Sequence, residues 1–163
     1  MLDGPAARRK ENIIQIKEAE SVPIYGREGR NDGRQQQRGK MATPQTFLII
    51  EDEPLIAMML EDFLEALGHR VAGTADTVSD AISQVDGASF DAAILDVHLR
   101  GEACWPVADA LVDAGRPFLL ATGGVVGETP TAHRAAPVLA KPFTIDSVER
   151  ALNQLRQDQP GQG

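Results

Sequence analysis

The sequence predicts a doubly wound α/β domain built on a five-stranded parallel sheet. Five short apolar runs of strand length alternate with stretches whose apolar residues recur at helical spacing. Strands with near-continuous apolar character are typical of parallel strands that are covered on both faces and joined by right-handed crossovers. The length of 163 residues, with 42% hydrophobic and 25% charged residues, indicates one globular domain with a modest core.

The expected elements follow one another from residue 46. The expected strands cover residues 46–50, 69–75, 90–96, 117–122 and 137–140. Between and after them, helical stripes begin after Pro54, at Val78, near Val107 and at Ile145. Pro54 suits a first helical turn and Gly68 a helix stop, and the stripe from Val78 is expected to end before Gly87. The pattern therefore accounts for five strands and four helices.

One further helix, between the last two strands, is expected to be weak. Residues 123–137 read GGVVGETPTAHRAAP, with three glycines and two prolines. This composition has little helix propensity and much backbone freedom. We expect a mobile loop or a short, poor helix there.

The chain before the first strand differs in composition. Residues 1–43 are dominated by Gly, Arg and Gln, and their apolar patch IIQIKEAE is too short to build a core. We expect a disordered tail; the alternative is an untranslated extension, because Met41 stands just ahead of the first strand. Residues 158–163 are expected to be a flexible C-terminus, which leaves residues 44–157 as the folded domain.

Charge limits the classes of partner. Residues 1–43 hold nine Lys/Arg against six Asp/Glu, whereas residues 44–163 hold seven against eighteen, a net charge of −11. This acidic part disfavours direct DNA binding and favours divalent cations. The sequence has no apolar run of membrane-spanning length, no secretory signal, and a single cysteine, Cys104. We expect a cytoplasmic protein without a membrane partner.

Polar residues stand where the predicted strands end. Glu51 and Asp52 follow the first strand, Asp96 ends the third, Thr122 the fourth, and Lys141 follows the fifth. In a doubly wound sheet these carboxyl ends meet at one edge, where ligands bind. Three ionised acids placed together need a cation, and carboxylate oxygens suit octahedral Mg²⁺.

Each of these residues also has an ordinary structural explanation. Acids at residues 51–53 would favour the start of a helix. A lone Asp or Thr after a strand is often a turn or cap residue, and a Lys-Pro pair is often a solvated loop. The four strand ends together, in this order, favour a site.

The ordered set resembles the receiver domain of two-component response regulators over about residues 46–157. The segments that carry the resemblance are LIIEDEPLIA, AILDVHL, LLATGG and VLAKPF. It implies a flavodoxin-like fold in which Asp96 is the phosphoacceptor and Asp52 a direct Mg²⁺ ligand. It further implies that Glu51 acts on Mg²⁺ through water and His98 through its backbone carbonyl. Thr122 and Lys141 would contact the phosphoryl group.

The sequence departs from the common receiver pattern at residue 138. Many receivers carry Tyr or Phe three residues before the lysine, and this chain has Val138. The run LLATGG resembles a subgroup marked by Phe-Ala-Thr-Gly that lacks the aromatic switch, although Leu120 replaces its Phe. Signal output is therefore expected to use an element other than an aromatic ring.

The resemblance implies a single-domain response regulator that is a phosphoacceptor switch rather than an enzyme. Its expected donor is a histidine kinase or a histidine phosphotransfer protein, its downstream protein is unknown, and it would be a monomer or a phosphorylation-dependent dimer. One alternative is a degenerate receiver that acts as an interaction module. Another is a phosphatase with an Asp nucleophile, which the sequence disfavours because His98 stands where the second Asp would be needed.

Overall fold

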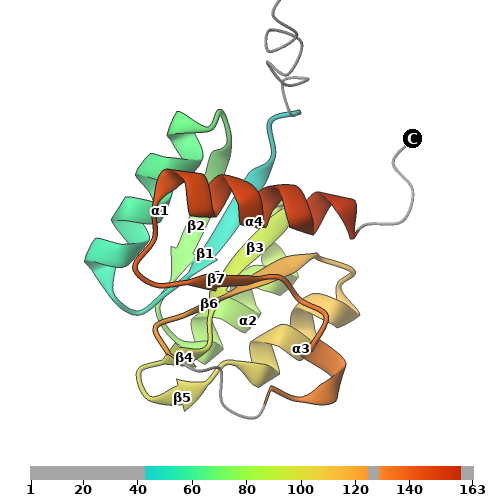
Figure 1. The fold of residues 1–163 in the computed structure, drawn as a ribbon. Coiled ribbons are helices and arrows are strands. Elements are labelled where there is room, and N and C mark those ends of the chain that lie inside the picture. The colour runs from blue at the N-terminus through green and yellow to red at the C-terminus, as the bar shows by residue number, and fades with distance from the viewer. Residues whose placement is uncertain (1–42, 125–128, 159–163) are drawn as a thin grey trace, which may run out of the picture. The chain divides into compact units, whose positions relative to one another are not determined.

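The computed structural model describes residues 43–124 and 129–158, which belong to one compact unit, Met41–Gly163. Its parallel sheet has the strand order β2-β1-β3-β6-β7 (Figure 1). The five strands are β1 Thr46–Ile50, β2 Arg70–Ala75, β3 Ala92–Asp96, β6 Phe118–Thr122 and β7 Val138–Ala140. The helices are α1 Pro54–Ala66, α2 Val78–Gly87, α3 Trp105–Asp113 and α4 Ile145–Gln157. This architecture confirms the predicted fold class.

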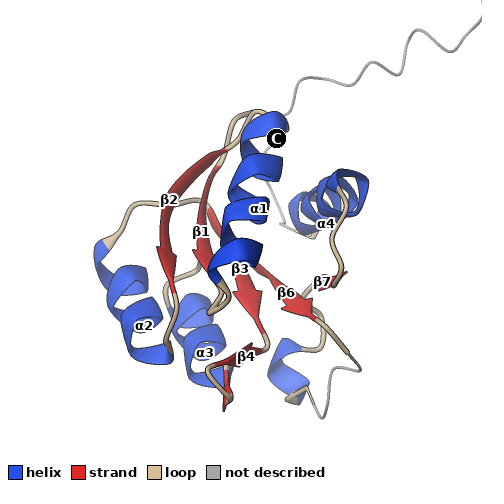
Figure 2. Cartoon of the chain, turned by 90° about the vertical axis from the view of Figure 1, so that its left-hand side faces the viewer, coloured by secondary structure: helices blue, strands red, loops and turns tan. Residues whose placement is uncertain are grey.

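Helices cover both faces of the sheet. Figure 2 shows α2 and α3 on one side and α1 and α4 on the other. Successive strand residues point to opposite faces, so Leu48 and Ile50 pack with α2 and α3, while Phe47 and Ile49 pack with α1 and α4. All five residues of β3 are buried, as expected for a central parallel strand. The two cores hold the carboxyl ends of the strands in fixed register.

Local signals in the sequence set the helix ends. Pro54 begins α1, and Gly68 follows that helix with φ +83°, the left-handed conformation that favours glycine. The side chain of Thr144 accepts a hydrogen bond from the Ser147 amide in a capping box at the start of α4. The helix α2 continues through Gly87, one residue past the point where it was expected to end.

Two features between the main elements complete the fold. Residues 98–103 form an antiparallel hairpin, β4 His98–Leu99 with β5 Glu102–Ala103, that the sequence did not predict. The expected weak helix is represented, within the described residues, by a single 3-10 turn, η1 Thr131–His133. Val125 and Val126, which belong to the segment expected to be a mobile loop or a short, poor helix, lie outside the described residues.

The expectations for the two ends of the chain fall almost entirely outside the structure. Residues 1–42 and 159–163 are not described. Within the described ranges, no helix combines the length and the apolar character needed to cross a bilayer.

Candidate functional site

Three carboxylates meet at the carboxyl edge of the sheet. Glu51 and Asp52 follow β1, Asp96 ends β3, and the two strands pair in parallel register with Ile50 opposite Leu95. Oxygens of the three carboxylates all lie within 4.8 Å of one another. Glu51 and Asp96 are buried, with 3% and 7% of their surface exposed. The predicted strand ends therefore converge as the doubly wound topology requires.

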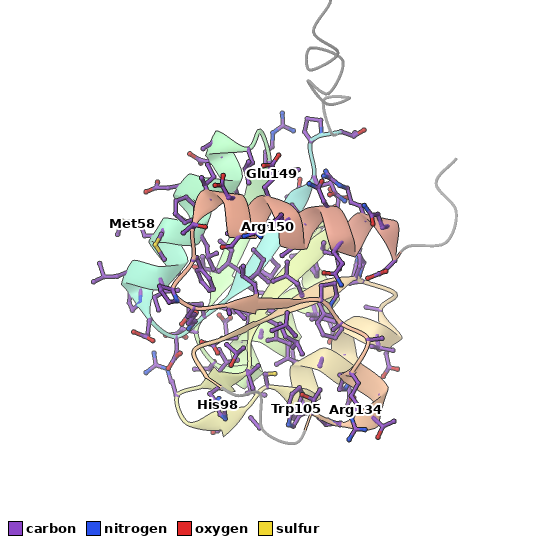
Figure 3. All side chains as sticks on the ribbon, in the orientation of Figure 1. Met58, His98, Trp105, Arg134, Glu149 and Arg150 are labelled. Carbon is purple, nitrogen blue, oxygen red and sulfur yellow. The ribbon has the colours of Figure 1, made fainter. Side chains whose placement is uncertain are left out.

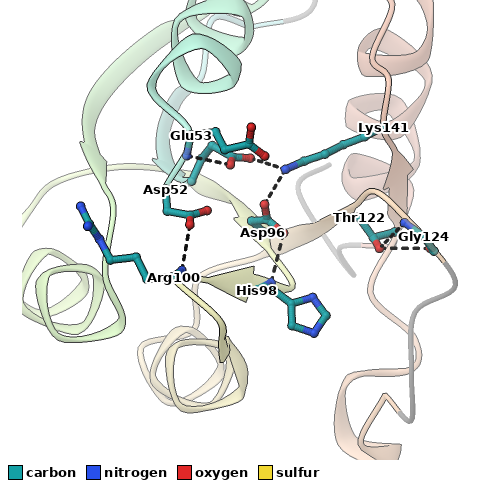
Figure 4. Close-up of polar contacts among 9 residues, drawn as sticks. Asp52, Glu53, Asp96, His98, Arg100, Thr122, Gly124 and Lys141 are labelled. Atoms are coloured by element: carbon teal, nitrogen blue, oxygen red, sulfur yellow. Dashed lines mark hydrogen bonds and ion pairs between the residues drawn. The ribbon is translucent and has the colours of Figure 1, made fainter.

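The ammonium of Lys141 lies between two of these acids. Its Nζ is 2.5 Å from Oδ2 of Asp96 and 2.8 Å from Oε2 of Glu51 (Figure 4). Lys141 directly follows β7, and β6 lies between β7 and β3. The lysine side chain therefore extends past the end of β6 to meet Asp96 at the end of β3. The pairing offsets the charge of two carboxylates that have lost most of their water.

Burial and neighbouring charges shift two pKa values in the site. Burial raises the pKa of the Glu51 carboxyl above its ordinary value, and the negative charge of Asp96 adds to this rise, while Lys141 and the Glu53 amide oppose it. Burial alone would lower the pKa of the Lys141 ammonium, but its hydrogen bonds and charge interactions with Asp96 and Glu51 raise the pKa overall. The cluster thus favours a bound positive charge.

The donor set of the site fits Mg²⁺. Oxygen ligands on one octahedral Mg²⁺ lie about 3 to 4 Å apart, because each is about 2.1 Å from the ion. The three carboxylates are close to that spacing and offer the hard oxygens that the ion prefers. Oε2 of Glu51 is buried, with the Lys141 ammonium at 2.8 Å as its neighbour, and a carboxylate oxygen can accept more than one contact. It retains capacity for a further partner.

His98 and Thr122 flank the acids. The His98 amide donates to Oδ1 of Asp96 at 3.1 Å, and the residue is exposed, at the outer edge of the molecule in Figure 3. The Thr122 hydroxyl is occupied within its own loop: it donates to the Gly124 carbonyl at 3.1 Å and accepts from the Gly124 amide at 3.3 Å. Val138 is 51% exposed on β7.

Arg100 is a residue of the site that the sequence did not reveal. Its amide donates to Oδ2 of Asp52 at 2.8 Å, and its guanidinium pairs with Asp76 in the loop after β2. Arg100 has φ +50°, which costs a residue other than glycine about 1–2 kcal/mol. An Arg-Gly pair is not the Asn-Gly signal of a tight hairpin, so the sequence offered little to predict this turn.

Comparisons with known proteins agree with the geometry. The profile of the response regulator receiver domain matches residues 47–153. The chain is 53% identical to SdrG from Sphingomonas melonis Fr1, with a TM-score of 0.63, over 69% of this chain and 97% of that one. It is also similar to the BeF3-activated conformation of SdrG from Pseudomonas melonis Fr1, with 53% identity and a TM-score of 0.60 over 68% of this chain and 94% of that one.

A curated relative matches over a similar range. The phyllosphere-induced regulator PhyR of Methylorubrum extorquens is 36% identical over 114 residues, which are 66% of this chain and 42% of that protein. The chain spans less than half the length of the curated relatives that it matches.

Proposed function

The chain belongs to the response regulator receiver domain family, and on this premise we propose that it is a phosphoacceptor switch that carries its phosphoryl group on Asp96. The observation that carries the proposal is the position of Asp96, which is buried at the sheet edge within ion-pair distance of Lys141 and beside two further acids. A rigidly held carboxylate surrounded by charge-balancing groups is what phosphoryl transfer to an acid requires.

The residues of the site have separable roles in the proposed reaction. An ionised oxygen of Asp96 attacks the phosphorus of a phosphohistidine donor, the bond from phosphorus to the donor nitrogen breaks, and the nitrogen keeps that electron pair. Lys141 exchanges its contact with Asp96 for one with the incoming phosphoryl oxygens. Thr122 turns its hydroxyl from Gly124 toward the same group.

Mg²⁺ fits the acidic end of the site as the cofactor. When bound, it neutralises negative charge on the transferring phosphoryl oxygens and on the acids. We propose that Asp52 holds it directly, that Glu51 holds it through water, and that Asp96 and the backbone carbonyl of His98 complete the protein ligands. Glu51 and Asp52 would take no part in bond making; they would hold and orient the ion.

We further propose that the chain works as a single-domain response regulator. Support comes from its match with SdrG along 97% of that chain. The phosphoryl donor would be a histidine kinase or a histidine phosphotransfer protein, and output would be partner binding or onward phosphotransfer. The acidic domain has no charge pattern suited to direct DNA contact.

Phosphorylation of the purified chain tests the proposal. Incubation with acetyl phosphate and Mg²⁺ should add one phosphoryl group in intact-mass spectra, and Asp96→Asn should abolish the addition, since the amide keeps the shape but loses the nucleophile. Asp91→Asn, an exposed acid at the opposite end of the same strand, is the matched control. Uptake at the wild-type level by Asp96→Asn would refute the assignment, and no uptake by any variant would favour a phosphorylation-independent interaction module.

A further inference from the structure

Arg100 connects three segments around the acidic site. Its amide donates to Oδ2 of Asp52, in the loop after β1, at 2.8 Å. Its Nε donates to the backbone carbonyl of Asp76 at 3.2 Å, and its Nη2 pairs with the Asp76 carboxylate in the loop after β2. Arg100 itself sits at the tip of the β4–β5 hairpin. Figure 4 shows the amide contact with Asp52 and the side chain extending away from the acids.

The hairpin tip adopts a conformation that its sequence does not favour. Arg100 and Gly101 both have positive φ, +50° and +83°, as the two central residues of a type I′ turn require. Glycine suits that conformation and arginine does not, because its Cβ is crowded. A residue held in an unfavourable backbone conformation is stabilised by contacts elsewhere. For Arg100 these are the two hydrogen bonds that its guanidinium donates to Asp76.

The turn determines where the Arg100 amide points. Asp52 is only partly buried, and it lies beyond the end of β1, where ladder hydrogen bonds no longer hold the chain. An amide fixed at one carboxylate oxygen limits rotation of the group, and the other oxygen of Asp52 points toward Asp96 in Figure 4. The side chain of Arg100 thereby acts on Asp52 through its own backbone.

We propose that Arg100 is a positioning residue for Mg²⁺: its ion pair with Asp76 clamps the hairpin so that its amide preorganises the Asp52 carboxylate. The inference rests on the proposed function, because it assigns a role toward the cation of that site. The Arg100 side chain is 59% exposed and its guanidinium is paired with Asp76, so its charge reaches the cation site only weakly.

Charge and positioning predict opposite results, which makes the inference testable. If Arg100 acted only by its charge, Arg100→Ala would bind Mg²⁺ more tightly and Asp76→Ala more weakly. The double variant, whose local net charge equals that of the wild type, would then bind like the wild type. If Arg100 positions Asp52, the double variant should bind Mg²⁺ about 3- to 10-fold more weakly. This is less than the roughly 10- to 100-fold loss typical when an outer-shell partner is removed, because the backbone amide of residue 100 is still present and only its placement is lost. Arg100→Ala should then lose less affinity than the double variant, and Asp76→Ala more.

The measurement is the Mg²⁺ dissociation constant, obtained by titrating the full chain and following amide chemical shifts of residues 51–53 and 96–101. Arg100→Gly adds a readout that a purely structural role would not give. Glycine suits the turn but cannot tie the hairpin tip to Asp76, so the urea midpoint without Mg²⁺ should equal or exceed that of the wild type, while Mg²⁺ affinity falls because the hairpin tip can move relative to Asp52. Arg150→Ala, on the exposed surface of α4, removes the same charge far from the site and is the control (Figure 3).

The outcomes separate this inference from the proposed function. Wild-type affinity in the double variant, or in Arg100→Gly, would overturn the positioning role alone, provided that Asp52→Asn still weakens Mg²⁺ binding in the same titration. Failure of the wild-type protein to bind Mg²⁺ would overturn both the positioning role and the proposed metal site. A loss of affinity that appears only together with an equal loss in Arg150→Ala would also overturn the role of Arg100.

Discussion

Lys141 Nζ lies 2.5 Å from Oδ2 of Asp96, so the proposed acceptor is already paired with a cation before any phosphoryl group arrives. The same ammonium lies 2.8 Å from Glu51, whose side chain is 1% exposed. The internal lysine therefore balances part of the negative charge of these acids, and it is also the group that we propose contacts the phosphoryl oxygens. The pairing of Lys141 with the acids bears on the stability of the domain, and its proposed contact with the phosphoryl group bears on phosphoryl binding.

Replacing Lys141 with methionine should destabilise the domain without divalent cations by about 3–5 kcal/mol, the range for removing one partner of a buried ion pair. The pKa of Glu51 is already raised by burial and by Asp96, and removal of Lys141 takes away an influence that opposes the rise. The folded variant would then bind a proton at higher pH than the unfolded chain, whose ordinary value is 4.5. The defect should be largest at about pH 7.5 and should shrink as the pH falls through the pKa of folded Glu51.

Urea unfolding of Lys141→Met and the wild type, at about pH 7.5 and at a series of lower pH values, is the measurement. Arg150→Met on the exposed face of α4 is the control. A defect of the same size at every pH would show that lost packing, rather than unpaired acids, causes it.

His69 should make the fold less stable in mild acid. It is 7% exposed, its Nδ1 accepts a hydrogen bond from the Gln45 amide at 3.2 Å, and its ring meets Phe47 edge-on. Burial, with a contribution from the positive charge of Arg156, lowers its pKa below the ordinary value of 6.5. The unfolded chain therefore takes up the proton first as the pH falls, and stability is lost from about pH 6.5 down to the pKa of the folded state, by at most about 1.4 kcal/mol per pH unit.

The difference between His69→Asn and the wild type isolates this effect. Asparagine keeps an acceptor near the position of Nδ1 but does not titrate, while the carboxylates titrate alike in both proteins. Urea midpoints between about pH 7.5 and pH 5.5 should fall more steeply for the wild type. Parallel pH profiles would assign the acid sensitivity to other groups.

Sequence patterns predicted the sheet and the acids because both depend on periodicity and topology. Near-continuous apolar runs predicted strands covered on both faces, as Phe47 and Leu48 show by packing in opposite cores, and parallel strands necessarily bring Asp96 to the same edge as Glu51. The hairpin at Arg100 and the environment of His133 were not predicted. Each depends on contacts between segments distant in sequence, 24 residues apart for Arg100 with Asp76 and for His133 with Asp109. Neither contact leaves a local pattern.

His133 should be a packing residue that holds the 3-10 turn η1 against the rest of the domain. Its side chain, 3% exposed, stacks on Trp105 with ring centroids 5.9 Å apart and meets Phe118 at 6.0 Å, and its Nε2 is 2.8 Å from Oδ1 of Asp109. Asp109 is 67% exposed, so water competes for its charge. His133→Ala should cost about 2–3 kcal/mol of unfolding free energy by leaving a void between aromatic rings.

Asp109→Asn keeps the acceptor oxygen and removes the charge, so it should change the free energy of unfolding by less than about 1 kcal/mol. Urea unfolding followed by the fluorescence of Trp105 compares the two variants. Equal losses would show that the polar contact with Asp109, rather than ring packing, holds His133 in place.

Thr122, rather than residue 138, should carry the response to phosphorylation. The Thr122 hydroxyl is bound to both backbone groups of Gly124, and reaching a phosphoryl group on Asp96 would require it to leave them. β3 and β6 are adjacent, with Asp96 opposite Ala121, so the exchange needs only a local rotation at the end of β6. A charge-assisted hydrogen bond to a phosphoryl oxygen is worth about 1.5–3 kcal/mol, against about 0.5–1.5 kcal/mol for each of the two neutral bonds with Gly124, so the one new bond is comparable to the two that it replaces. Val138 is half exposed and has no ring to move.

Addition of beryllofluoride should therefore shift the Gly124 amide resonance in the wild type and in Val138→Ala. Thr122→Val, which is nearly isosteric but lacks the hydroxyl, should lose most of that shift, whereas a response lost in Val138→Ala and kept in Thr122→Val would place the switch on β7.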